Sequence, residues 1–182
     1  MVNLLQWNDY EGYDGAVLGY NIYRSVNEVF DPIPIATIGI GPRFYEDNVE
    51  SFVGSTANGK FCYYVEAIEN LNSYGLEERA KSNIACGTEE PLLFVPNAFI
   101  VGGVNAEFGP EVSYIDFDQY EFNVYNRWGK LVFQTNDAGE KWDGKFNGYL
   151  CREDVYVYIL TFRNGDGATR VQKGHVTLLK SE

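Results

Sequence analysis

The stretch YEFNVYNRWGKLVFQT, residues 120–135, predicts two strands joined by a tight turn. Phe122 and Val124 alternate on one side of the first strand, and Leu131 and Phe133 resume the alternation after the turn. The residues between them, 126–129, have turn composition, and Gly129 provides the positive φ that such turns demand. The stretch therefore predicts a β-hairpin.

Arg127 and Trp128 lie in this turn and allow two interpretations. In the first, Trp128 buries about 150–250 Å² as a lid over the end of the domain. Arg127 then stacks on Trp128 or on Trp142, or pairs with Asp143. In the second interpretation, Arg127 and Trp128 form an exposed patch that a partner protein recognises. The first, structural role is the one we favour from the sequence.

Short alternating segments of this kind recur along the whole chain. Aromatic residues make up 16% of the 182 residues, and 19 residues are glycine, which is typical of strands and turns. The segment KFCYYVEAIEN at 60–70 alternates cleanly, and Asn-Gly-Asp-Gly at 164–167 separates two further strands. No amphipathic helix of useful length is present. The sequence predicts an all-β protein of two tandem antiparallel β-sandwiches, residues 1–88 and 94–182, joined by a linker at 89–93.

The charge pattern excludes several classes of function. Fourteen basic and 26 acidic side chains give a formal charge of −12, without the basic stripe of a nucleic-acid binder. Anionic membrane surfaces are excluded as partners for the same reason, and no apolar run is long enough to span a bilayer. Met1 leads directly into VNLLQWNDY, which is typical of folded sequence, so we expect a fragment that starts within its first domain.

Two of the three cysteines are placed to pair. If the strand at 60–70 returns through a turn centred near Tyr74, Cys62 faces Cys86. A cross-strand disulfide between them would stabilise the domain by about 3 kcal/mol and would imply an oxidising compartment. Two small buried thiols are the alternative. Cys151 is then expected to be a free thiol near a loop.

The sequence contains no motif that indicates a catalytic site or a cofactor site. His175 is the only histidine, and no nucleophile elbow or zinc spacing accompanies it. The acidic loops at 136–144 and 164–167 offer oxygen ligands for calcium, but both are better explained as turns. We predict a protein that is not an enzyme and holds no cofactor, with calcium as the alternative.

The first half resembles a fibronectin type III module. The resemblance rests on LLQW at 4–7, GYNIYRS at 19–25 and CYYVEAIE at 62–69, with Trp7 as the module's tryptophan. The leading strand of the module has no counterpart in residues 1–88 and is expected to be missing.

The second half resembles the gliding-motility-associated C-terminal domain of the Bacteroidota, a type B sorting domain of the type IX secretion system. Six segments occur in the same order as in that family: FVPNAF, YNRWG, LVFQT, WDG, VYVY and KGHVTLL, within residues 94–179. The resemblance implies an Ig-like sandwich that directs a large protein through the outer membrane to the cell surface or medium. The segment at 100–111 departs from the family because it lacks the acidic loop that could hold calcium.

We therefore expect a non-catalytic sorting domain behind a fibronectin-type spacer, with an outer-membrane secretion component or carrier protein as partner. The residues that we expect the partner to contact are Arg127, Trp128, Trp142 and Lys180, the last in the terminal strand. The alternative is an adhesin-like module in which Trp142 and Tyr149 form a flat platform for glycans.

Overall fold

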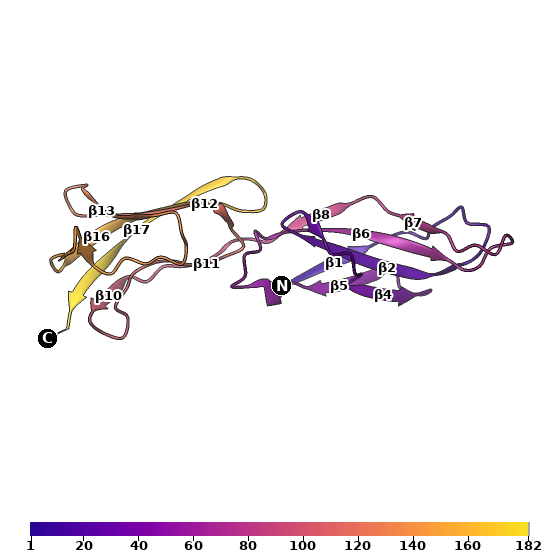
Figure 1. Cartoon of the computed structure of the whole chain (residues 1–182), viewed down its shortest axis with the longest axis horizontal. Coiled ribbons are helices and arrows are strands. Elements are labelled where there is room, and N and C mark those ends of the chain that lie inside the picture. Colours follow the sequence, from indigo (N-terminus) through magenta and orange to yellow (C-terminus); the bar gives the residue numbers. More distant parts are fainter. Residues whose placement is uncertain (182) are drawn as a thin grey trace. The chain divides into compact units, whose positions relative to one another are not determined.

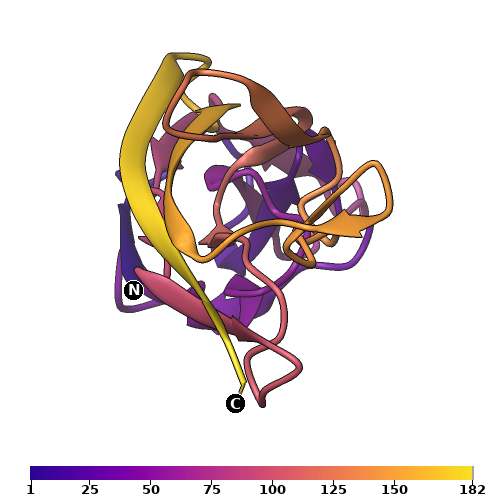
Figure 2. The ribbon, with the colours of Figure 1, turned by 90° about the vertical axis from the view of Figure 1, so that its left-hand side faces the viewer.

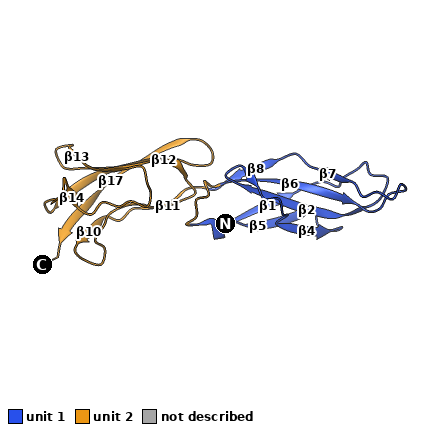
Figure 3. Ribbon diagram, viewed as in Figure 1, with its two compact units in different colours: residues 1–53, 60–89 blue, residues 54–59, 90–182 orange. Residues whose placement is uncertain are grey.

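The computed structural model describes residues 1–181, and its regular elements are almost all β-strands (Figure 1). The predicted all-β class is confirmed. Contacts divide the chain into two compact units, shown in Figure 3. Unit 1 comprises Met1–Val53 and Lys60–Glu89, and unit 2 comprises Gly54–Gly59 and the chain from Glu90 onward. In residues 1–181, no helix reaches the length and apolarity that crossing a membrane requires.

Unit 1 consists of two facing sheets. The smaller sheet pairs β1 (Val2–Gln6) with β5 (Phe44–Asn48). The larger sheet is built around two long central strands that pair with each other. Its members are β2 (Val17–Val26), β3 (Val29–Phe30), β4 (Ala36–Gly39), β6 (Lys60–Glu69), β7 (Arg79–Lys81) and β8 (Ala85–Thr88), and a short 3₁₀ turn, η1 (Glu50–Phe52), follows β5.

Apolar side chains from both sheets meet in the core of unit 1. Tyr20 and Ile22 on β2 are buried, with Val65 on β6, and Leu5 and Trp7 pack against them from the side of β1. This burial follows from the two-residue period of a strand, which places every second side chain on the inner face.

A polar network crosses the same interior. Asp47 is 4% exposed, and both of its carboxylate oxygens accept hydrogen bonds from Arg24 Nη1 at 2.8 Å. The Tyr63 hydroxyl donates to Asp47 at 2.8 Å and accepts from Asn3 Nδ2 at 3.0 Å. The buried carboxylate is therefore compensated by a cation and a phenol, which buried charges require.

The structure joins Cys62 and Cys86 in a disulfide, with their Cα atoms 4.0 Å apart. These two residues also face each other in the register of β6 and β8, which is the pairing that the sequence predicts. The same register does not extend to β7, where Glu66 faces Lys81. The segment between β7 and β8 therefore absorbs a shift of one residue.

Unit 2 is organised around one five-stranded sheet. Its strand order is β10 (Ala98–Val101), β17 (Thr169–Lys180), β16 (Asp154–Arg163), β12 (Asp116–Tyr125) and β13 (Leu131–Thr135). The β10–β17 pair is parallel, whereas the other pairs in this sheet are antiparallel. Two short sheets complete the unit, β9 (Leu92–Phe94) with β11 (Glu111–Ser113), and β14 (Lys145–Phe146) with β15 (Tyr149–Leu150).

Aromatic rings dominate the core of unit 2. The rings of Phe99 and Trp142 lie 5.4 Å apart, those of Trp142 and Tyr156 4.8 Å, and those of Phe108 and Phe122 5.6 Å. A glycine is required beside this core, because a Cβ at Gly174 would lie 2.5 Å from the Tyr158 hydroxyl across the β16–β17 pair. Gly174 therefore leaves room for the tyrosine on the neighbouring strand.

Unit 2 also includes the loop 54–59. The domain boundary predicted from the sequence, at residue 88, would place this loop in the first domain. Gly54 N donates to Ser113 Oγ at 3.0 Å, and Gly165 N donates to Asn58 O at 2.8 Å. Ala57 is 2% exposed within this loop. The sequence cannot reveal this assignment, because residues 54–59 carry no strand period.

Candidate recognition surface

The turn that joins β12 to β13 is held rigidly by one side chain. The Asn126 Oδ1 atom accepts hydrogen bonds from Trp128 N and Lys130 N, each at 3.0 Å. Two backbone hydrogen bonds, Asn126 N to Lys130 O and Gly129 N to Asn126 O, close the turn at 2.9 Å each. Gly129 has φ 76°, as the sequence predicts. The backbone of the turn is therefore preorganised by these hydrogen bonds.

Trp128 is 77% exposed, so the prediction that it forms a buried lid is wrong. The Arg127 guanidinium lies 5.6 Å from the centre of the Trp128 ring and 3.4 Å from an oxygen of Asp154. Arg127 thus pairs with Asp154 and not with Asp143 or Trp142. Both side chains face solvent, with Trp128 77% exposed and the Arg127 side chain 62% exposed.

Two further segments reach the same end of unit 2. Asp154 is the first residue of β16, and its neighbour Glu153 accepts a hydrogen bond from Lys180 N, at the end of β17, at 2.9 Å. The turn and the terminal strand therefore flank one acidic dipeptide. We call this end of unit 2 the tip; it comprises the turn 126–130, the β14–β15 hairpin 145–150, residues 153–154 and residues 179–181, and Figure 2 views the molecule from this side.

The β14–β15 hairpin adds a second exposed aromatic side chain to the tip. Lys130 Nζ lies 4.4 Å from the centre of the Phe146 ring, which connects the hairpin to the turn. Tyr149 is 81% exposed and Leu150 is 43% exposed. Trp, Tyr and Arg are the residue types that dominate the binding energy of protein interfaces. The tip therefore has the composition of a protein-binding surface.

Trp142 does not belong to this surface, so the prediction that it contacts a partner is wrong. It is 0% exposed, and its indole Nε1 donates to Lys145 O at 2.9 Å. Paired backbone hydrogen bonds of 2.8 Å with Phe108 hold it in the core. A glycan platform made of Trp142 and Tyr149 is excluded for the same reason, because only Tyr149 reaches solvent.

Asp143, predicted as a structural residue, holds the first residue of the β14–β15 hairpin by two hydrogen bonds. Its carboxylate accepts from Lys145 N at 2.9 Å and from Lys145 Nζ at 2.7 Å. The hydrogen bond from the lysine side chain lowers the pKa of Asp143 below its ordinary value. Asp143 therefore orients the residue whose carbonyl receives the Trp142 indole.

Cys151 lies half-buried behind the tip as a free thiol. Burial raises its pKa, which keeps the sulfur protonated and a poor nucleophile near neutral pH. Burial also raises the pKa of Tyr156 to about 12, and the Tyr156 hydroxyl donates to Arg152 O at 2.9 Å. Neither group has the chemistry of a catalytic pair.

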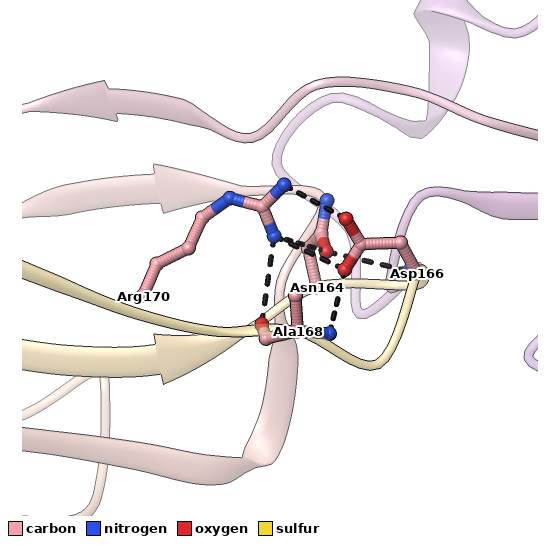
Figure 4. A network of polar contacts seen from close by, with 4 residues as sticks. All are labelled: Asn164, Asp166, Ala168 and Arg170. Carbon is pink, nitrogen blue, oxygen red and sulfur yellow. Dashed lines mark hydrogen bonds and ion pairs between the residues drawn. The ribbon is translucent and has the colours of Figure 1, made fainter.

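The acidic loop at 164–167 is closed by an arginine from the strand that follows it (Figure 4). Arg170 donates to Asp166 Oδ2 at 2.8 Å and to Asn164 Oδ1 at 2.6 Å, and Ala168 N donates to Asp166 Oδ1 at 2.7 Å. The hydrogen bond from Arg170 lowers the pKa of Asp166. Within residues 1–181, no three His, Cys, Asp or Glu side chains gather in a way that would hold a metal ion.

A second turn of the same construction lies in unit 1, where the sequence predicts a turn centred near Tyr74. Asn72 Oδ1 accepts from Tyr74 N and Leu76 N at 3.0 Å each, and Gly75 has φ 74°. Tyr74 occupies the position of Trp128 and is also 77% exposed. The shared signal is an asparagine, an aromatic two residues later and a glycine after it, in NSYGL and NRWGK.

Comparisons with known proteins match the second half of the chain to a family. Residues 93–178 match the family described as CHU_C Type IX secretion signal domain. A solved structure of fibronectin(III)-like modules of Clostridium thermocellum CbhA aligns over 98% of this chain and 86% of that chain, with 12% identity and a TM-score of 0.29. No curated protein matches the chain.

Proposed function

Because residues 93–178 are similar to a type IX secretion signal domain, we propose that unit 2 is the address label of a large exported protein. The label directs its cargo across the outer membrane to the cell surface or the medium. In this proposal unit 2 is not a catalyst, and unit 1 is a fibronectin-type spacer between label and cargo.

We further propose that the tip is the surface that an outer-membrane secretion component or carrier protein contacts. The main observation that supports this is the position of Trp128, which is 77% exposed on a turn whose backbone is held by two hydrogen bonds to Asn126. A preorganised turn loses little backbone conformational entropy when a partner binds it, so more of the contact energy remains as affinity.

Charge supports the same assignment. Residues 1–90 carry five basic and 14 acidic side chains, whereas residues 91–182 carry nine and 12. The tip carries four cations against two carboxylates, so it is net positive in a protein that is acidic overall; these residues are Arg127, Lys130, Lys145, Lys180, Glu153 and Asp154. A partner with acidic groups around an apolar pocket for Trp128 would complement this surface.

An export assay tests both parts of the proposal. The whole chain is fused behind a periplasmic reporter in a host with a working type IX system, and reporter is measured in the periplasm, on the cell surface and in the medium. We expect export of the unaltered fusion, at least a tenfold loss for Trp128→Ala, and a smaller loss for Arg127→Ala.

Tyr74→Ala is the matched control, because it removes an equally exposed aromatic from an equivalent turn in unit 1. It should be exported normally. Retention of the unaltered fusion in the periplasm would show that the chain is not a sorting signal. Normal export of Trp128→Ala would leave the sorting function intact but remove the tip as the contact surface.

A further inference from the structure

The outer face of the five-stranded sheet in unit 2 is apolar where a solvent-facing sheet is normally polar. Residues 155–160 on β16, VYVYIL, are all apolar. Tyr156, Tyr158 and Leu160 turn inward and are buried in the core. An antiparallel strand with one solvated face normally alternates apolar with polar residues, whereas a strand buried on both faces is apolar throughout. The sequence of β16 is therefore typical of a strand that is covered on both sides.

The outward side chains form one continuous patch across β12, β16 and β17 and the neighbouring β13 (Figure 1). Val157 on β16 is 44% exposed, and the register places Tyr125 on β12 and His175 on β17 on either side of it. Large contiguous apolar patches on a protein surface mark interaction sites. We call this surface the outer patch; its apolar members are Tyr125, Leu131, Val155, Val157, Ile159 and Val171.

Two charged groups without a counter-ion lie on opposite sides of the outer patch. Glu121 is on β12 and Lys173 is on β17, so β16 runs between them. Neither forms an ion pair within residues 1–181. Glu121 Oε1 accepts from Asn123 Nδ2 at 2.8 Å and from Gln134 Nε2 at 3.0 Å, which holds the carboxylate on this face. Two strand spacings of about 4.8 Å keep Glu121 and Lys173 about 10 Å apart within one copy.

We propose that the outer patch pairs with the outer patch of a second copy of this chain. A two-fold axis parallel to β16, between the two sheets, brings the β17 side of one copy over the β12 side of the other. Val157 and Ile159 of the two copies then meet at the centre. Lys173 of each copy lies over Asn123 and Glu121 of the other, which are two positions apart on one face of β12. Sheets packed face to face lie about 10 Å apart, so side chains from both meet between them.

Self-complementarity favours a second copy over an unrelated partner. A second copy supplies a carboxylate for Lys173 and a cation for Glu121 at once, because the two-fold axis repeats each contact. The formal charge of −12 opposes self-association in general. Residues 1–90 carry 5 basic and 14 acidic side chains, a net −9, whereas residues 91–182 carry 9 and 12, a net −3. Pairing through unit 2 therefore joins the less charged parts of the two copies.

The size of the patch sets the expected affinity. The ten residues of β16 extend about 34 Å, and three neighbouring strands are about 14 Å wide. The footprint is about 480 Å² per copy, or about 1,000 Å² for the pair, which is the lower limit for a specific interface. We therefore expect a reversible dimer with a Kd in the micromolar range.

Sedimentation velocity of the purified full chain tests the proposal without any export. The chain is measured over about 1–500 µM, the range that a micromolar Kd requires. We expect a monomer–dimer equilibrium, weakened at least tenfold by Val157→Lys, because the lysine would be buried without a counter-ion. Val29→Lys is the matched control, since Val29 is an exposed strand valine in unit 1; it should leave the equilibrium unchanged.

A charge exchange tests the proposed geometry. Lys173→Glu and Glu121→Lys should each weaken the dimer at least fivefold, because like charges then meet at both contacts. An equal mixture of these two variants should dimerise as tightly as the unaltered chain, since opposite charges meet again in the mixed pair.

A chain that stays monomeric over the whole range overturns the proposal, whatever else covers the patch. So does a dimer that survives Val157→Lys, or a mixture of the two charge variants that dimerises no better than each alone. Should Val157→Lys fail to fold, the mixture still decides.

Discussion

Replacing Trp142 with alanine should destabilise unit 2 severely. The side chain is 0% exposed and touches Phe99 and Tyr156 through ring centroids 5.4 and 4.8 Å away. A buried tryptophan removes about 150–250 Å² from water, worth about 4–6 kcal/mol at about 25 cal/mol per Å². An alanine at this position still buries part of this area. Trp→Ala substitutions in protein cores lower the free energy of unfolding by about 3–5 kcal/mol. We expect a loss of about 4 kcal/mol for Trp142→Ala.

Trp142→Phe separates the packing from the hydrogen bond. Phenylalanine retains most of the ring contact but leaves Lys145 O without the indole donor that lies 2.9 Å away. This hydrogen bond is part-buried, and a typical intramolecular hydrogen bond contributes about 0.5–1.5 kcal/mol, so this variant should lose less than half as much as alanine does. The hydrogen bond also links the core to the β14–β15 hairpin, so exchange of the hairpin amides should rise in both variants.

Urea unfolding with hydrogen exchange resolved by mass spectrometry measures the two units separately. With a urea m-value of about 1.5 kcal/mol/M, a 4 kcal/mol loss lowers the midpoint of unit 2 by about 2.7 M. Peptides from unit 1 should keep their midpoint. Trp128→Ala, at a site 77% exposed, should stay within about 0.5 kcal/mol of the unaltered protein. The reasoning is refuted if Trp142→Ala costs less than Trp128→Ala, or if both cost about the same.

Two further outcomes follow from the contacts. The double variant Cys62→Ala/Cys86→Ala should lower the free energy of unfolding of unit 1 by about 3 kcal/mol, because the bridge closes a loop with a sequence separation of 24; an unchanged urea midpoint for unit 1 would contradict this. Arg170 lowers the pKa of Asp166, so its contribution to stability is present above the ordinary carboxyl pKa of 3.8 and is lost as pH falls through the lower folded value. Protection of the Ala168 amide should therefore fall in acid, and a similar fall in Asp166→Asn would show that another group is responsible.

Strand periods and turn residues were sufficient to predict most of the secondary structure. Alternation over 60–70 predicted the long central strand β6, because side chains of one face recur at every second position of a strand. The Cys62–Cys86 pairing followed from a simple hairpin register. The parallel β10–β17 pair did not follow, because the residues of a short strand do not specify which distant strand it joins.

The candidate site was harder to predict, since the sequence shows the type of a side chain but not its direction. Trp128 and Trp142 both precede a glycine or an aspartate-glycine pair, and both were open to either role. Their exposures of 77% and 0% are set by distant partners. Trp142 is buried because Phe108, 34 positions earlier in the chain, pairs with its backbone. No local pattern encodes that contact.

The two asparagine–glycine turns show which residues the turn geometry requires and which it does not. At both turns the asparagine accepts two backbone N–H groups and the glycine takes φ near 75°, so these two residue types are required by turn geometry. The aromatic residue directly before the glycine is not fixed by turn geometry, because Tyr74 and Trp128 are both 77% exposed. An indole at Trp128 therefore contributes little to folding. In the proposed function a partner buries this indole, so Trp128→Ala should reduce export strongly while it leaves the stability of unit 2 nearly unchanged.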